Sequence, residues 1–213
     1  MSDGLLRDER VSLPVTSTRT IYNGRVWDVR QEVFDYAGSE LTRDYVAHTG
    51  AVAVLVLGEN ENVLAIQQYR HPVRLREWEI PAGLLDISGE SPLECAKREL
   101  AEEADLVAET WHLLADYATS PGGSDEIIRI FLARDVRATD APHEREGEES
   151  DMVVRWVPLS TAVESVLAGH VSNSIFTIAM LSADASRNRE WSTLREADAP
   201  WPQQQWRDSR ERS

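Results

Sequence analysis

Three glutamates in the middle of the chain are spaced for joint chemistry on a helix. Glu99 and Glu103 are four residues apart and Glu102 is three after Glu99, so their carboxylates share one helical face. Like charges at this spacing cost about 0.2–0.5 kcal/mol per pair. One interpretation is a solvated acidic surface. The other is a cage for a hard divalent cation such as Mg²⁺ or Mn²⁺, which takes carboxylate oxygens, waters and substrate phosphates as ligands.

The residues before the glutamates predict the helix that carries them. Ser91 suits the N-cap, Pro92 the first helical position, and Glu94 the acid of a capping box. An apolar stripe then recurs at helical spacing, at Leu93, Ala96 and Leu100. Cys95, the single cysteine, lies beside this stripe and is interpreted as buried filler. We therefore expect one helix after a tight turn and a loop that begin at Ala82.

The surrounding pattern resembles the box of the Nudix hydrolases over about 24 residues. The matching positions are Gly83, Glu90, Arg98-Glu99-Leu100, Glu102-Glu103 and Leu106. Six residues separate Gly83 from Glu90 where the usual box has five, and we expect the loop to absorb the extra residue before the helix starts. Asp105 replaces the closing glycine, whose left-handed conformation aspartate tolerates better than most residues.

Two further segments resemble the ADP-ribose pyrophosphatase branch of that family. The first is Gln68-x-Arg70 followed by Glu79-x-Pro81-Ala82-Gly83; the alternative for Arg70, and for the nearby Arg74 and Arg76, is an ordinary surface arginine. The second is SPGGSDE at 120–126, which is a β-turn in any interpretation. Pro121 lies 16 residues beyond position 105, the distance that marks this branch.

The resemblance implies a role for each matching residue. The metal ligands would be Glu99, Glu103 and the backbone carbonyl of Ala82, with Glu102 reaching the metal through water and Arg98 orienting the carboxylates. The substrate-binding residues would be Arg70 at the diphosphate, Ser120, Pro121 and Glu126 near the terminal ribose, Arg43 and Asp44 at the adenine end, and Leu84 lining the site.

A general base is expected from the acidic segment 139–151, because the helix glutamates would be occupied by metal. The resemblance implies a glutamate of this loop, and its position relative to Asp151-Met152 selects Glu148, with Glu149 as runner-up. The alternative for such a charge run is a solvated connector.

The expected fold class is mixed α/β, a Nudix α/β/α sandwich preceded by an N-terminal antiparallel β meander. We expect a disordered lead-in at 1–14, the meander at 15–48, the Nudix hydrolase domain at 49–186 and a polar tail at 187–213 with three embedded tryptophans. Expected strands are 51–57, 63–69, 111–117, 127–133 and 152–157, and expected later helices are 158–167 and 172–183.

Composition narrows the function classes. The chain has 213 residues and a formal net charge of −15, which argues against nucleic acid and anionic membranes as partners. One cysteine excludes an internal disulfide framework and fits the cytoplasm. The charged N-terminus does not resemble a signal peptide, and the longest apolar run, 51–57, is too short to span a bilayer. Motifs of serine hydrolases, P-loop NTPases, Rossmann proteins and HExxH metalloproteases are missing.

The resemblance therefore implies Mg²⁺-dependent hydrolysis of ADP-ribose to AMP and ribose 5-phosphate, with Mn²⁺ as a possible substitute, by a homodimer whose meander completes the partner's adenosine site. Two alternatives stay open. One is a Nudix hydrolase of another nucleoside diphosphate sugar or a dinucleotide. The other is a non-catalytic nucleotide-sugar sensor, for which Asp105 is the supporting residue.

Overall fold

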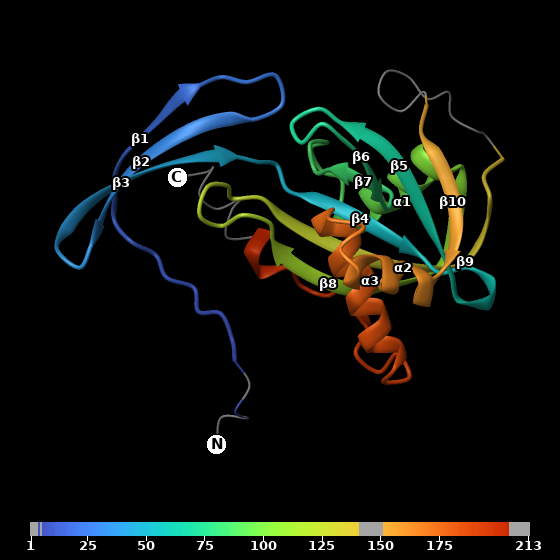
Figure 1. Cartoon of the computed structure of the whole chain (residues 1–213). Coiled ribbons are helices and arrows are strands. Elements are labelled where there is room, and N and C mark those ends of the chain that lie inside the picture. Colours follow the sequence, from blue (N-terminus) through green and yellow to red (C-terminus); the bar gives the residue numbers. More distant parts are fainter. Residues whose placement is uncertain (1–3, 5, 141–150, 205–213) are drawn as a thin grey trace. The chain divides into compact units, whose positions relative to one another are not determined.

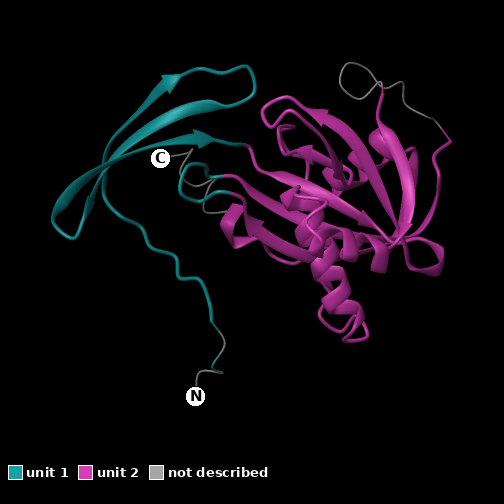
Figure 2. Ribbon diagram, viewed as in Figure 1, with its two compact units in different colours: residues 1–48, 120–125 teal, residues 49–119, 126–213 magenta. Residues whose placement is uncertain are grey.

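The computed structural model describes residues 4, 6–140 and 151–204, which form two compact units. Unit 1 comprises residues 1–48 together with 120–125, and unit 2 comprises residues 49–119 and 126–213 (Figure 2). The elements are labelled in Figure 1. No helix among the described residues is long and apolar enough to cross a membrane.

Unit 1 is an antiparallel meander, β1 (Val15–Tyr22), β2 (Asp28–Tyr36) and β3 (Ser39–Ala47). Its β2–β3 hairpin closes through Ala37 and Gly38, which both have positive φ, at 55° and 82°. Two such residues match the twist of the flanking strands. The amide of Val46 donates to the carbonyl of Gly123 at 2.9 Å, so the 120–125 segment is bonded to the end of β3.

The described residues of unit 2 form two sheets and three α-helices. The first sheet has the order β10-β5-β6 and the second the order β11-β8-β9-β4-β7. The strands are β4 (Ala51–Val56), β5 (Asn62–Arg70), β6 (Leu75–Glu79), β7 (Ala82–Leu84), β8 (Leu106–Ala118), β9 (Ile127–Ala138), β10 (Val153–Pro158) and β11 (Arg195–Glu196). The helices are α1 (Pro92–Ala104), α2 (Leu159–Leu167) and α3 (Ser174–Arg187), with a short 3-10 turn at Glu59–Glu61.

Strand β4 is the centre of this unit because it is buried along its whole length. It pairs in parallel with β9 and antiparallel with β7, and a strand covered on both faces reads as a continuous apolar run. Val52, Val54 and Val56 pack in the cluster that contains Cys95, Ala96 and Leu100 of α1. The alternate residues pack in the cluster that includes residues of α2 and α3, which lie in front of β4 in Figure 1. The mixed α/β sandwich is thus confirmed.

Several expected boundaries were wrong. Residues 82–84 form a short strand, β7, and not a tight turn. Strand β6 was not predicted, because its residues, Leu-Arg-Glu-Trp-Glu, lack the regular alternation of apolar and polar side chains that indicates a strand. Strands β8 and β9 are longer than expected, since their ladder continues past the buried core into exposed residues. Helix α3 begins at Ser174, where the side chain of Asn173 accepts from the amide of Phe176.

The tail carries two tryptophans that dock on unit 2. Trp201 is only 4% exposed, and the guanidinium of Arg129 lies 4.7 Å from the centre of one of its rings. Trp191 is stacked in the same way by Arg134, at 4.3 Å. The third tryptophan, Trp206, lies outside the described residues. Residues 187–204 therefore belong to the packed body as well as being polar in composition.

Candidate active site

Helix α1 begins and ends as its sequence predicts. The Ser91 hydroxyl accepts from the Glu94 amide at 3.3 Å, and the Glu94 carboxylate accepts from the Ser91 amide at 3.0 Å, which completes the capping box. At the other end Asp105 has φ 54° and ψ 35°, the left-handed conformation expected of the closing glycine. The extra loop residue is absorbed before Ser91, so the spacing of the helix glutamates is unaffected.

Arg98 holds three carboxylates around one guanidinium. Its Nε and Nη2 donate to the two oxygens of Glu90 at 2.9 and 3.0 Å. Its Nη1 donates to Glu99 at 2.5 Å and to Glu102 at 3.0 Å. The bond to Glu90, followed by the charge and bond of Glu99, raises the pKa of Arg98, and the guanidinium lowers the pKa of Glu90. The arginine therefore compensates the like charges that the helix concentrates on this face.

Strand β7 lies directly against the acidic face of α1. The amide of Ala82 donates to Oε2 of Glu103 at 2.9 Å, and Glu103 is only 6% exposed. A Cβ on Gly83 would lie 1.9 Å from Cδ of Glu99, so any other residue at this position would displace the Glu99 side chain or the strand. Glu99 and Glu103 thus both contact the backbone of β7, Glu99 at Gly83 and Glu103 at Ala82.

The donor set fits a hard divalent cation. Glu99, Glu102 and Glu103 supply carboxylate oxygens, the ligands that Mg²⁺ and Mn²⁺ prefer. Among residues 4, 6–140 and 151–204, no three His, Cys, Asp or Glu side chains form a ready-made ligand cluster. The glutamates point instead toward Arg98 and the Ala82 amide, so binding a metal would require them to exchange some of these bonds.

Arg70 is held by a buried carboxylate of the same unit, that of Glu79. Its Nε and Nη2 donate to the two oxygens of Glu79 at 2.7 and 2.6 Å. The side chain of Arg70 is 41% exposed whereas that of Glu79 is 1% exposed. Of the other two arginines, Arg76 pairs with Asp151, which lowers the pKa of that carboxyl, and Arg74 adopts a positive φ of 57°. Arg70 is therefore the one of the three that is anchored from the interior.

The other predicted substrate residues are spread over both units. In unit 2, Leu84 lies in β7, and Glu126 accepts from the Thr119 hydroxyl at 2.6 Å. In unit 1, Ser120 and Pro121 are exposed in a turn that the Ser120 carbonyl closes by accepting from the Gly123 amide at 2.9 Å. Also in unit 1, two β3 residues pair with β2: Arg43 lies opposite Glu32, and Asp44 accepts from the Gln31 side chain.

The two candidates for the general base, Glu148 and Glu149, lie outside the described residues. Sequence reasoning assigned no role to two residues that the structure makes prominent. Glu90 was noted only as a matching position, although it forms both bonds of a fork with Arg98. Glu79 was likewise only part of a motif, and no pattern in the sequence of β6 indicated that its carboxylate is buried.

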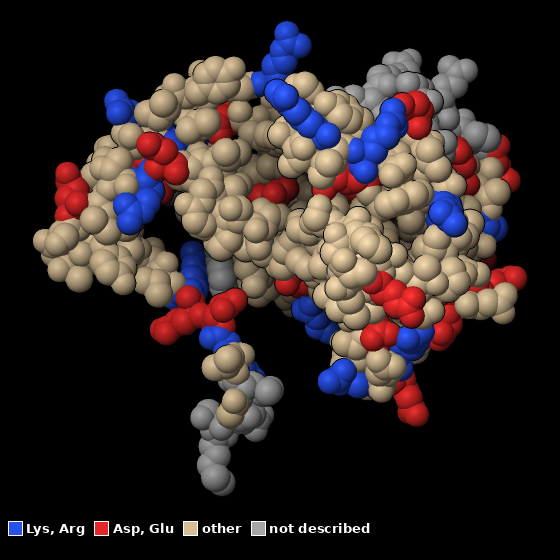
Figure 3. Space-filling view, in the orientation of Figure 1, with Lys and Arg blue, Asp and Glu red and all other residues tan. Residues whose placement is uncertain are grey.

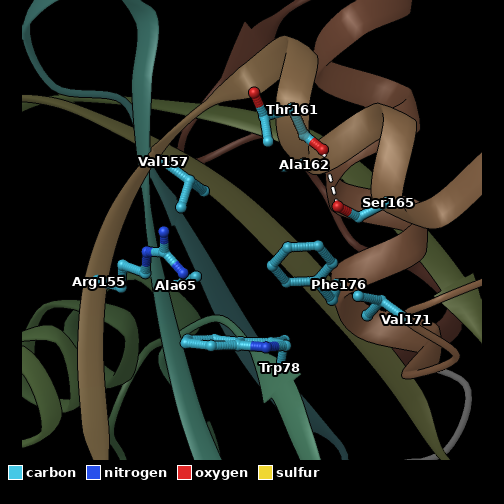
Figure 4. Close-up of a pocket in the computed structure, with 9 residues that line it drawn as sticks. All are labelled: Ala65, Trp78, Arg155, Val157, Thr161, Ala162, Ser165, Val171 and Phe176. Carbon is cyan, nitrogen blue, oxygen red and sulfur yellow. Dashed lines mark hydrogen bonds between the residues drawn. The ribbon is translucent and has the colours of Figure 1, made fainter.

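A cavity of about 130 Å³ opens on the other side of the core from α1. Figure 4 shows the rings of Trp78 and Phe176 and the guanidinium of Arg155 around it. Small-molecule sites usually measure about 300–1,000 Å³, so this cavity is too small for a nucleotide sugar.

On the face seen in Figure 3, Lys and Arg side chains lie beside Asp and Glu side chains, so the net charge of −15 does not form one continuous acidic surface there.

Comparisons with known proteins identify the family. The NUDIX domain model matches residues 47–176. The ADP-ribose pyrophosphatase of Mycobacterium tuberculosis (strain ATCC 25618 / H37Rv) is 41% identical over 170 residues, which are 79% of this chain and 82% of that protein. The ADP-ribose pyrophosphatase of Bacillus subtilis (strain 168) is 36% identical over 148 residues, 68% of this chain and 78% of that protein.

A solved structure agrees at the level of the fold. The crystal structure of an ADP compounds hydrolase superposes with a TM-score of 0.70 at 17% identity, covering 86% of this chain and 98% of that one. The chain belongs to the Nudix family, whose members generally use divalent metals. The resemblance in the helix and its loop is thereby confirmed, and the roles of the individual residues remain predictions.

Proposed function

We propose that this protein hydrolyses the diphosphate of ADP-ribose to AMP and ribose 5-phosphate, with Mg²⁺ as its divalent ion and Mn²⁺ as a substitute. The choice of ADP-ribose as the substrate is supported by the similarity to two ADP-ribose pyrophosphatases, which extends over most of each chain. The complete set of box glutamates, held by Arg98 and β7, supports a catalytic protein over a sensor.

Each residue of the proposed site has a distinct task. Glu99, Glu103 and the Ala82 carbonyl would hold the divalent ion, with Glu102 acting through water. A bound ion would neutralise charge on the diphosphate and activate the attacking water. Arg98 would keep the carboxylates oriented, since one guanidinium bonds to Glu99 and Glu102 together.

The remaining steps concern the substrate and the proton. Arg70 would bind the diphosphate through its guanidinium, whose planar fork matches phosphate oxygens. Ser120, Pro121 and Glu126 would surround the terminal ribose, and Leu84 would line the site. Glu148 would take the proton from the attacking water, with Glu149 as the alternative.

The meander is assigned to the adenosine end and to dimerisation. Arg43 and Asp44 would contact adenine, and residues 15–48 would associate with a second copy of the chain. Exposed apolar side chains on these strands, among them Ile21, Tyr22 and Tyr36, support an additional partner surface. Size-exclusion chromatography with light scattering tests this directly, because a monomeric mass at micromolar concentration would contradict the dimer.

The test of the function is turnover of a substrate panel with and without Mg²⁺. ADP-ribose, other nucleoside diphosphate sugars and dinucleotides would be incubated with the full chain, and products identified by chromatography. Mg²⁺-dependent conversion of ADP-ribose to AMP and ribose 5-phosphate with the highest kcat/KM is the expected result. Preference for another compound would replace the substrate, and a folded protein that turns over none of them would favour the sensor.

The base is tested by two matched variants. Glu148→Gln should lower kcat by roughly 10²–10⁴, which is the usual contribution of a general base. Glu149→Gln alters the neighbouring carboxylate in the same way and should have a much smaller effect. A larger loss in Glu149→Gln would transfer the role to Glu149.

A further inference from the structure

Glu79 is a buried carboxylate to which the proposed reaction gives no task. It ends β6 and is 1% exposed, yet three side-chain hydrogen bonds converge on its oxygens. Oε1 accepts from Nε of Arg70 at 2.7 Å, and Oε2 accepts from Nη2 of Arg70 at 2.6 Å and from Nε2 of Gln68 at 3.3 Å. Burying a carboxylate is costly unless it is paired, so this group is retained together with its partners.

The strand register explains how the three side chains meet. Glu79 lies opposite Ile66 in the antiparallel β5–β6 pair, so Ile66, Gln68 and Arg70 share its face of β5. Arg70 is four residues along the strand from the position opposite Glu79, and its long side chain must reach back past Gln68 to make the fork. Leu64, on this same face, packs in the cluster with α1. The guanidinium is thus directed along the face that the catalytic helix covers.

The chain runs from Glu79 directly into the proposed metal-binding strand. Two residues on, the Pro81 carbonyl accepts from the Val54 amide at 2.8 Å, and the next amide, that of Ala82, donates to Glu103 at 2.9 Å. Glu79 therefore stands three residues from the carbonyl assigned to the metal, on a segment pinned to both β4 and α1. A carboxylate in this place has a fixed backbone from which to hold another side chain.

We propose that Glu79 is a positioning residue that fixes the guanidinium plane of Arg70 for the substrate diphosphate. The inference rests on the proposed function of the same site. An arginine with 41% of its side chain exposed has many rotamers, and a two-point bond to a buried carboxylate selects one of them. Glu79 itself touches no substrate; it keeps the phosphate-binding group in place before the substrate arrives.

The experiment is a double-mutant cycle on ADP-ribose turnover with saturating Mg²⁺. Glu79→Gln keeps the size of the side chain and removes the charge and one acceptor, and it should lower kcat/KM by about 10–100-fold, mainly through KM. Arg70→Ala should lower kcat/KM at least as far. Glu79→Gln should then cost nothing further in the Arg70→Ala background, because the residue it positions is gone.

Asp116 offers a matched control in the same unit. It accepts from Nε of Arg129 at 2.8 Å and from Nη2 at 3.0 Å, and Arg129 is 3% exposed, so it is also a buried two-point pair. Asp116→Asn should lower the melting temperature as Glu79→Gln does and leave KM unchanged. Glu79→Asp, which keeps the charge, serves as a second variant for the cycle if Glu79→Gln does not fold.

The outcomes separate the inference from the function. A wild-type protein that does not hydrolyse ADP-ribose removes the proposed function, and the cycle is then run on whichever diphosphate it does hydrolyse; if it hydrolyses none, the inference falls as well. An active wild type with an unchanged kcat/KM in folded Glu79→Gln overturns the role of Glu79. Losses that multiply in the double variant also overturn it, because the two residues would then act independently.

Discussion

Gly83 and Glu99 approach so closely that any side chain at position 83 would have to displace Glu99 or β7. A Cβ on Gly83 would lie 1.9 Å from Cδ, 2.0 Å from Oε1 and 2.3 Å from Cγ of the Glu99 side chain. Strand β7, whose Ala82 carbonyl is a proposed metal ligand, therefore packs directly against Glu99, which is proposed to bind the same ion.

Gly83→Ala should lower kcat/KM by about 10²-fold, because displacing a catalytic group by around 1 Å has that effect. The added methyl group must push Glu99 or β7 away, and this displacement should also lower the affinity of the site for Mg²⁺. Steady-state kinetics across a Mg²⁺ titration measures both. Gly169→Ala is the control: its φ of 73° strains alanine, but its Cβ would meet nothing within 4 Å, so it should lose stability without losing activity.

Glu103→Gln should reduce turnover by roughly 10³-fold or more, since a catalytic metal supplies several kcal/mol of transition-state stabilisation. The amide oxygen of glutamine can still accept from the Ala82 amide, so the fold should survive. Turnover measures the loss of activity, and a thermal melt shows whether the variant is still folded. Glu109→Gln, on an exposed position of β8, is the matched removal of a charge; near-normal turnover in Glu103→Gln would contradict the metal assignment.

Substitutions at Asp105 should rank by how well each residue tolerates a left-handed backbone. Asp105→Gly should raise the free energy of unfolding by about 0.5–1 kcal/mol, and Asp105→Ala should lower it, because φ is 54° at this helix end. Urea denaturation of the three proteins gives the order. If alanine is as stable as glycine here, the conformation of residue 105 is not what limits stability.

Cys95 should be unreactive in the folded protein. Burial, and secondarily the nearby Glu99, raises the pKa of its thiol to about 12, compared with about 8.5 for an exposed cysteine. The stability that the neutral thiol contributes is complete below pH about 8.5 and is lost as the pH rises toward 12. Disulfide-exchange labelling at pH 8 should be slow in buffer and fast in urea. Rapid labelling in buffer would show that the α1 face opens readily.

Trp201→Ala should destabilise the protein by about 3–5 kcal/mol, the usual cost of removing a buried tryptophan. It would also uncover Arg129, whose Nη1 donates to the Ala199 carbonyl at 2.7 Å. Thermal melts and KM measurements separate the effects, since KM should not change. Trp156→Ala, at a side chain 43% exposed, should cost much less; equal losses would mean that the tail is not packed on the body.

The elements that could be predicted are those whose signals are local. Ser91, Pro92 and Glu94 determine where α1 starts from side-chain bonds within one turn, and the spacing of the glutamates then follows. Strand β6 and the fork between Arg70 and Glu79 could not be predicted in this way. They depend on which strand pairs with which, and residues nine apart in sequence meet only after the β5–β6 register is set.

The loop between β7 and α1 carries one residue more than the usual box, and the helix after it still begins at a complete capping box. Its turn closes where the Glu90 amide donates to the Ile87 carbonyl at 3.2 Å, and Gly89 takes a φ of 84°. The extra residue is therefore accommodated between Leu85 and Gly89, before the capped helix begins. A short peptide tag or fluorophore inserted after Asp86 would report on events near the acidic helix while leaving its register intact.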